Sequence, residues 1–154
     1  MIAGVRGTVT ARSGDLVTIA TAGGVSYEMA VPINVLEQLP SAGSEVYLHT
    51  VLVVREDGWA LYGFETANER IVFQRLLGAS GVGPRLALSL LSALGNDRVI
   101  RAITESDLSA LCTVSGVGKK KAERMVLELK DRMGDLEVTA GPASRLTTTT
   151  MTKS

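Results

Sequence analysis

Two stretches of the chain repeat one pattern: Leu76-Leu-Gly-Ala-Ser-Gly-Val-Gly-Pro-Arg-Leu-Ala87 and Leu111-Cys-Thr-Val-Ser-Gly-Val-Gly-Lys-Lys-Lys-Ala122. The first leucine, the serine, both glycines, the valine between them and the last alanine recur in phase. Apolar residues at helical spacing stand before and after each Gly-Val-Gly. The repeat therefore predicts a duplicated helix–tight turn–helix unit.

The chemistry of this turn favours phosphate binding. Glycine adopts backbone conformations that other residues avoid, and without a Cβ it lets another backbone approach closely. The helix after each turn begins with unpaired N–H groups and the positive end of its dipole. Cations follow each turn directly. Contacts of amides and cations with the phosphates of a DNA backbone do not depend on the base sequence. The predicted phosphate-binding residues are Gly81, Val82, Gly83, Arg85, Gly116, Val117, Gly118, Lys119 and Lys120, with Lys121 as a further candidate.

A simpler interpretation of one Gly-Val-Gly turn is a helix C-cap and connector. Two copies in phase, both followed by cations, favour the phosphate site instead. In either case we expect Val82 and Val117 to hold the turns on their own helices as apolar plugs.

Residues 1–65 have the composition of β structure, with β-branched alternation and Gly or Pro between the segments. The predicted strands are Val5–Ala11, Leu16–Thr21, Val25–Val31, Val46–Val54 and Trp59–Phe64, and a short helix is predicted at Ile33–Leu39. Five short strands predict a small closed or partly open barrel of the oligonucleotide-binding (OB) type. An SH3-like barrel fits the pattern almost as well.

Residues 66–135 are predicted to be all-α. The predicted helices are Thr66–Leu77, Pro84–Ala93, Asp97–Ile103, Ser106–Cys112 and Lys119–Met133. Residues 136–154 include four consecutive threonines and few large apolar residues, which predicts a flexible linker or end. The fold class is therefore α+β and multidomain: a five-stranded barrel at 1–65, a helical domain with two such turns at 66–135, and a tail.

The composition excludes several classes of protein. Apolar residues make up 45% of the chain, too many for a disordered protein, and no apolar run has the length of a membrane span. The N-terminus has no long apolar segment, so no secretory signal is expected. The single cysteine, Cys112, and the single histidine, His49, cannot form an internal disulfide or a four-ligand zinc site. We expect no metal, no cofactor and a cytoplasmic location.

The net charge of zero comes from 16 basic and 16 acidic residues, and by itself it argues against a nucleic-acid binder. The two signs are unevenly spread, however. Residues 1–65 carry three basic and seven acidic side chains, a net −4, whereas residues 66–135 carry eleven basic and eight acidic, a net +3. The helical region is therefore the basic part of the chain.

Two features of the barrel sequence have alternative interpretations. Glu56-Asp57-Gly58 is either an ordinary hairpin turn or a tip whose two carboxylates repel phosphates. Trp59, Tyr62 and Phe64 are either a base-stacking platform or part of the core, and we expect core. By its place in the repeat, Cys112 is also expected in the core.

The repeated Ser-Gly-Val-Gly turns resemble paired helix-hairpin-helix motifs. With the Met1-Ile2…Gly7 start, Val53-Val-Arg-Glu-Asp-Gly58 and Leu61-Tyr-Gly-Phe64, they resemble the RuvA family over residues 1–135. These are the bacterial Holliday-junction-binding subunits of the RuvAB branch-migration complex. The resemblance implies an OB-fold domain, two helix-hairpin-helix motifs and a tetramer, alone or paired with another, on a four-way DNA junction. It further implies a role in homologous recombination and DNA repair, with no catalysis by this chain.

The resemblance also assigns roles to single residues. Glu56 and Asp57 match the acidic pin at the junction centre, Arg55 beside them is a DNA contact, and Arg124 is a further phosphate contact. The family's partner is the ATPase RuvB, reached through a third helical domain after a linker. The chain ends within what matches the linker, which leaves open whether it engages RuvB.

Two other functions compete with junction binding. Glycosylases and some nucleases also use helix-hairpin-helix elements, but the acidic residues here are scattered and no P-loop occurs. A single-strand-binding OB protein is the third hypothesis, although six aromatic residues are few for a stacking surface.

Overall fold

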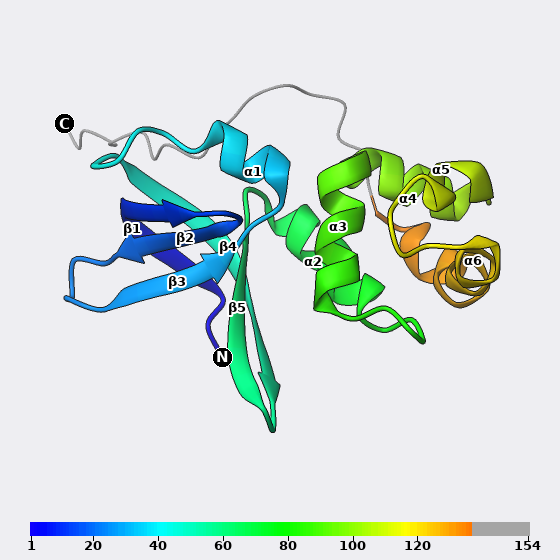
Figure 1. Cartoon of the computed structure of the whole chain (residues 1–154), viewed down its shortest axis with the longest axis horizontal. Coiled ribbons are helices and arrows are strands. Elements are labelled where there is room, and N and C mark those ends of the chain that lie inside the picture. Colours follow the sequence, from blue (N-terminus) through cyan, green and yellow to red (C-terminus); the bar gives the residue numbers. More distant parts are fainter. Residues whose placement is uncertain (137–154) are drawn as a thin grey trace. The chain divides into compact units, whose positions relative to one another are not determined.

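The computed structural model describes residues 1–136 (Figure 1). Residues up to Ala67 belong to one compact unit, and residues from Asn68 onward belong to a second. Each unit is described by itself below. The predicted linker at 136–154 lies outside the described residues, apart from its first residue.

The first unit is a closed five-stranded barrel in the order β1-β2-β3-β5-β4, which confirms the prediction of an OB-type barrel. Its elements are β1 (Gly4–Ser13), β2 (Leu16–Ala20), β3 (Ser26–Ala30), α1 (Ile33–Gln38), β4 (Glu45–Arg55) and β5 (Gly58–Phe64). All neighbouring pairs are antiparallel except β3 and β5, which meet at Ala30 and Tyr62.

The barrel forms because its strands alternate inward-facing apolar residues with polar ones. In β1, Val5, Gly7 and Val9 are buried, and Arg6 and Thr8 between them are less so. Val17 and Ile19 are the buried residues of β2. A register irregularity between Val9 and Ala11 bends β1. The core also holds Met29, Val31, Val35, Leu39, Val46, Leu48 and Leu61.

The second unit is entirely helical within the described residues. Its elements are α2 (Ala67–Leu76), α3 (Pro84–Leu94), α4 (Asn96–Thr104), α5 (Leu108–Cys112) and α6 (Lys119–Met133). Helix α4 joins two helix–turn–helix units, α2 with α3 and α5 with α6, and packs against α3, α5 and α6. The core contains the apolar faces of these helices, among them Phe73, Leu76, Leu90, Leu91, Ile100, Ile103, Leu111 and Met125.

Two predictions for α5 are wrong. The helix begins at Leu108, later than the predicted Ser106, because Ser106 has a φ of 56° and cannot continue a helix. Asp107 caps it instead, with its side chain accepting a hydrogen bond from the N–H of Ala110. Cys112 is exposed rather than buried, because the neighbouring Leu111 takes the core position.

Candidate nucleic-acid interface

The two glycine turns have the same backbone conformation. Gly81 and Gly116 have φ values of 78° and 93°, in the left-handed region that favours glycine. The hydrogen bonds also repeat: the Val82 N–H donates to the Ala79 carbonyl at 3.2 Å, and the Val117 N–H to the Val114 carbonyl at 3.0 Å. The sequence repeat is therefore a structural repeat.

Only the first glycine of each turn has the unusual backbone conformation that is predicted for both. Gly83 and Gly118 are extended, with φ of −92° and −91°, a conformation open to any residue. At Gly118 an added methyl group would meet no atom within 4 Å. The open space in front of this residue, rather than an unusual φ, would let a ligand come close to its backbone.

The valines between the glycines confirm the predicted plug. Val82 and Val117 are each 5% exposed. Their side chains pack inward while the flanking Gly81 and Gly118 stay exposed. Apolar burial of the valine therefore anchors each turn to the core of the helical unit.

The starts of helices α3 and α6 share features that favour anions. Along their described lengths neither has a side-chain cap at its first turn or an acidic residue there. At α3 the first residue, Pro84, has no N–H to offer, whereas at α6 the first residue is Lys119. The remaining free N–H groups and the dipole ends of both helices attract negative charge. Arg85, Lys119 and Lys120 are exposed at these two starts, and Lys121 is half-buried.

The two turns adjoin each other in a symmetrical way. A Cβ on Gly81 would lie 3.7 Å from Cε of Lys121, and a Cβ on Gly116 would lie 3.6 Å from Cδ1 of Leu86. Leu86 and Lys121 occupy the same place in the repeat. The first turn of α6 thus lies beside Gly81, and the first turn of α3 lies beside Gly116. The two helix starts are therefore close to each other.

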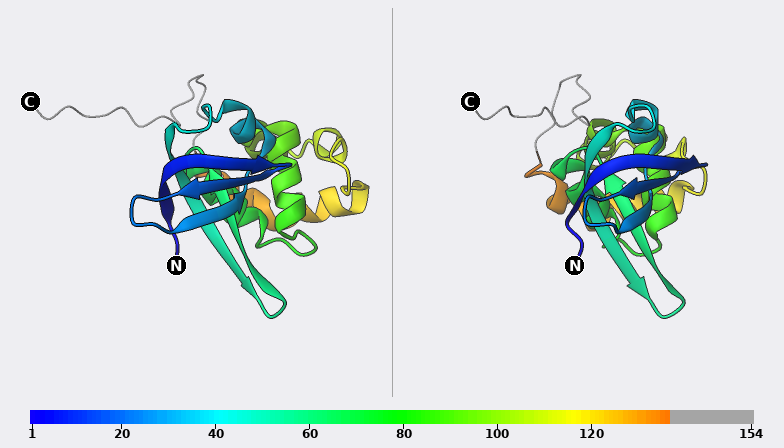
Figure 2. Two further views of the ribbon diagram at one scale, coloured as in Figure 1. Left: turned by 60° about the vertical axis from the view of Figure 1, so that its left-hand side comes forward. Right: turned by 90° about the vertical axis from the view of Figure 1, so that its left-hand side faces the viewer.

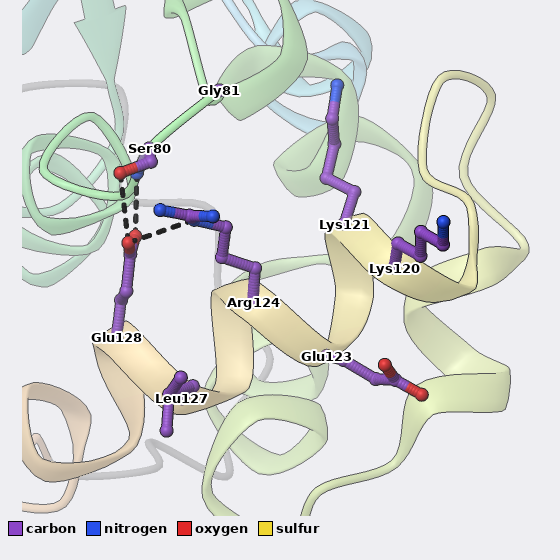
Figure 3. Close-up of a pocket in the computed structure, with 8 residues that line it drawn as sticks. All are labelled: Ser80, Gly81, Lys120, Lys121, Glu123, Arg124, Leu127 and Glu128. Atoms are coloured by element: carbon purple, nitrogen blue, oxygen red, sulfur yellow. Dashed lines mark hydrogen bonds and ion pairs between the residues drawn. The ribbon is translucent and has the colours of Figure 1, made fainter.

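A carboxylate of α6 ties the first turn to the second motif. The backbone N–H of Ser80 donates to Glu128 Oε2 at 2.6 Å, and its hydroxyl donates to Oε1 at 2.9 Å. Figure 3 shows this contact beside Arg124, whose Nε donates to the same Oε1 at 3.3 Å. These hydrogen bonds lower the pKa of Glu128, and those from Ser80 have the largest effect.

A surface hollow joins the first turn to the start of α6. Gly81 lies on one side of it, and Lys120, Lys121 and Arg124 rise from α6 on the other (Figure 3). The predicted phosphate contact Arg124 is exposed but shares its charge with Glu128. Sequence reasoning missed the contact between Ser80 and Glu128, because these residues belong to different motifs and no local pattern connects them. The i,i+4 spacing of Arg124 and Glu128 on one helix is the signal that could have indicated their ion pair.

The acidic turn is the tip of the β4–β5 hairpin. Arg55 pairs with Gly58 in the last register position, which leaves Glu56 and Asp57 as a two-residue turn. All four residues are exposed. The carboxylates therefore lie at the end of a ribbon that extends past the other strands of the barrel (Figure 2).

We expected the aromatic residues after this turn to lie in the core, but not all of them do. Phe64 is fully buried, and Tyr62 is half-buried. Trp59 is 75% exposed, because it stands two residues beyond Leu61, the last inward residue of β5 within the core. His49 packs edge-on against Tyr47, with ring centroids 5.0 Å apart.

Among the described residues, no three side chains of the metal-ligating kinds come together. In the same part of the chain, none of the helices has the length and apolar character of a membrane span.

Comparisons with known proteins match both units. The family described as the RuvA N-terminal domain matches residues 1–63, and the SAM-like helix-hairpin-helix tandem matches residues 73–131. The Holliday junction branch migration complex subunit RuvA of Gemmatimonas aurantiaca is 57% identical over 133 residues, which are 86% of this chain and 68% of that protein. The chain belongs to the RuvA family.

More distant relatives carry the same name. The proteins of Halorhodospira halophila and Pseudomonas fluorescens are 43% and 47% identical to this chain. The matches cover 94% and 90% of this chain, and 71% and 68% of those proteins. The family assignment thus rests on most of the chain and includes both the barrel and the repeated turns.

Proposed function

We propose that this chain binds four-way DNA junctions through their phosphates, without reading sequence, and serves as the tetrameric scaffold for branch migration in recombination and repair. The observation that carries the proposal is the pair of equivalent, uncapped helix starts on adjoining surface. Each offers backbone N–H groups and at least one exposed cation. Two such sites suit successive phosphates of one strand.

The proposed site consists of three parts. The turn residues Gly81, Val82, Gly83, Gly116, Val117 and Gly118 provide and position the amides. Arg85, Lys119, Lys120, Lys121 and Arg124 provide positive charge, and Arg55 adds a cation in the barrel. Because Arg124 is paired with Glu128, we expect it to contribute less than the lysines.

The acidic tip of the barrel supplies the preference for a junction. Glu56 and Asp57 carry two exposed negative charges that repel phosphates. Continuous duplex laid across this tip would bring its phosphates against the carboxylates. A junction has an open centre where its strands separate, and the tip fits there.

A four-way junction has four equivalent arms, so a four-fold assembly of this chain presents one set of turns to each arm. We propose that assembly, in the cytoplasm of a bacterium, with the motor supplied by a separate ATPase such as RuvB. The chain itself would hydrolyse neither DNA nor ATP. The relatives' name, a branch migration complex subunit, supports this division of work.

The test is a gel shift with four-way junction, duplex and single strand of matched sequence, with and without Mg²⁺. We expect the tightest binding to the junction and no cleavage. Tightest binding to single strand would support the alternative of a single-strand-binding barrel, and strand cleavage by the purified chain would support a repair nuclease.

A further inference from the structure

The acidic tip is bordered by an exposed apolar pair. Val54 and Trp59 are direct cross-strand neighbours in the β4–β5 hairpin. They are 58% and 75% exposed, whereas most large apolar side chains of the barrel are buried. Trp59 is the only tryptophan in the sequence.

This pair continues the inner face of the barrel beyond its end. The next pair inward on the same face is Leu52 with Leu61. Leu61 belongs to the barrel core, and the half-buried Leu52 packs against it. In both views of Figure 2 the β4–β5 ribbon extends beyond the other strands. Val54 and Trp59 pair near its tip, one position before the last pair, Arg55 with Gly58. The face therefore stays apolar past the point where the barrel can cover it.

The charges around the pair indicate what covers it. A second copy laying the same hairpin here would bring its Glu56 and Asp57 against these carboxylates, which repel one another. A phosphate would meet the same two carboxylates against the single cation Arg55, and the net charge here is negative. A nucleobase is flat, aromatic and uncharged, so it can lie on an indole beside these carboxylates.

We propose that Trp59, flanked by Val54, stacks on the face of a base at the crossover of the junction. This inference rests on the proposed function. In a junction held open, the base pairs next to the strand-exchange point lose one stacking neighbour. The indole would replace that neighbour, while Glu56 and Asp57 keep the backbones apart.

The single tryptophan makes the test direct, because all indole fluorescence reports on Trp59. We expect free protein to emit as an exposed tryptophan that acrylamide quenches readily. Saturating four-way junction should quench the emission and reduce the access of acrylamide, and matched duplex should not. A junction with abasic analogues beside the exchange point should bind without this change, whereas the same analogues in the middle of the arms should preserve it.

Variants test the contribution to binding. Trp59→Ala should weaken junction binding at least about fivefold and leave duplex binding unchanged, since stacking on an aromatic side chain is worth about that much or more per base. Trp59→Phe should keep most of the junction affinity that Trp59→Ala loses.

Each contrary result has one meaning. A junction that binds in the gel shift without changing the emission overturns the stacking inference and leaves junction binding intact. So does quenching that persists with abasic analogues at the crossover, or a free protein whose tryptophan is already shielded. Failure to bind the junction at all would instead overturn the proposed function.

Discussion

The two glycines of each turn differ in what they contribute, and substitutions can separate the contributions. Gly116 needs its positive φ of 93°, whereas Gly118 is extended and faces open space. The stability of the fold should therefore depend on the first glycine. The close approach of a ligand should depend on the second.

Gly116→Ala should destabilise the helical unit by about 1–2 kcal/mol, the cost of a side chain in left-handed backbone. Thermal or denaturant unfolding measures the change. Gly118→Ala is the matched control, because its backbone suits any residue and unfolding should change much less. Equal loss of stability in both variants would mean that the conformation of the turn is not what Gly116 provides.

Gly118→Ala should nevertheless weaken junction binding, since its methyl group would occupy the space in front of the backbone. The measurement is the junction affinity of the folded variant. Unchanged affinity would show that no phosphate approaches this residue.

Between elements, two carboxylates connect the first motif to α6 and to the turn that follows it. Glu128 binds Ser80, and Asp135 forms a two-bonded ion pair with Arg75 at 2.6 and 3.2 Å. Both carboxyl groups have a lowered pKa, caused mainly by the hydrogen bonds from Ser80 and Arg75 respectively. These ties keep the two turns in their adjoining places.

A lowered pKa in the folded state means that the charged carboxylate stabilises the fold, and that this stability is lost as the pH falls. For Glu128 the loss begins below its ordinary value of 4.5 and proceeds through the lower folded-state pKa. Glu128→Gln should therefore lower the melting temperature at pH 7 but have little effect at pH 3. A melting-temperature difference that is the same at both pH values would contradict this role.

The carboxylates of the hairpin tip make a separate prediction. Glu56→Gln with Asp57→Asn keeps the shape of the tip and removes both charges. Duplex affinity should rise, and the preference for junction over duplex should fall. Asp15→Asn with Glu28→Gln is the matched control, because it removes two exposed charges elsewhere in the barrel. Identical behaviour of the two double variants would show that repulsion at the tip does not set the preference.

The strands and the two glycine turns could be predicted from the sequence because their signals are local. Strand alternation, the Gly-Val-Gly repeat and Pro84 mark the strands and the turns. The start of α5 was not predictable, because it depends on a positive φ at Ser106 that no neighbouring residue requires. The exposure of Trp59 and the bond between Ser80 and Glu128 depend on where the barrel ends and how the motifs pack, and neither leaves a periodic pattern.

For the whole molecule, the net charge of zero is the sum of an acidic and a basic region. The barrel region is acidic and ends in a negative tip, while the helical region is basic around its turns. The four-arm scaffold that we propose would need both signs, one to attract the arms and one to repel their backbones at the centre.

The four-fold assembly predicts a native mass of about four times 16.2 kDa for the free protein. Light scattering coupled to size exclusion at micromolar concentration measures it. A monomer under these conditions would contradict the scaffold, whatever the affinity for DNA.

Phosphate binding at the turns also predicts how affinity responds to salt. Lys119→Ala with Lys120→Ala should lower the slope of log affinity against log salt by about 2, because each phosphate that the protein no longer neutralises lowers the slope by about 1. Arg98→Ala with Arg101→Ala removes the same charge from exposed positions on α4 and should change the slope less. An equal change of slope in both double variants would contradict phosphate binding at the turns.

The most direct test of the central claim is competition for a labelled four-way junction at fixed salt. Unlabelled junctions of unrelated sequence should displace it equally well, and duplex or single strand of the same length should need far higher concentrations. Equal displacement by duplex, or preference for one junction sequence, would contradict a protein that recognises the junction through its phosphates and its open centre.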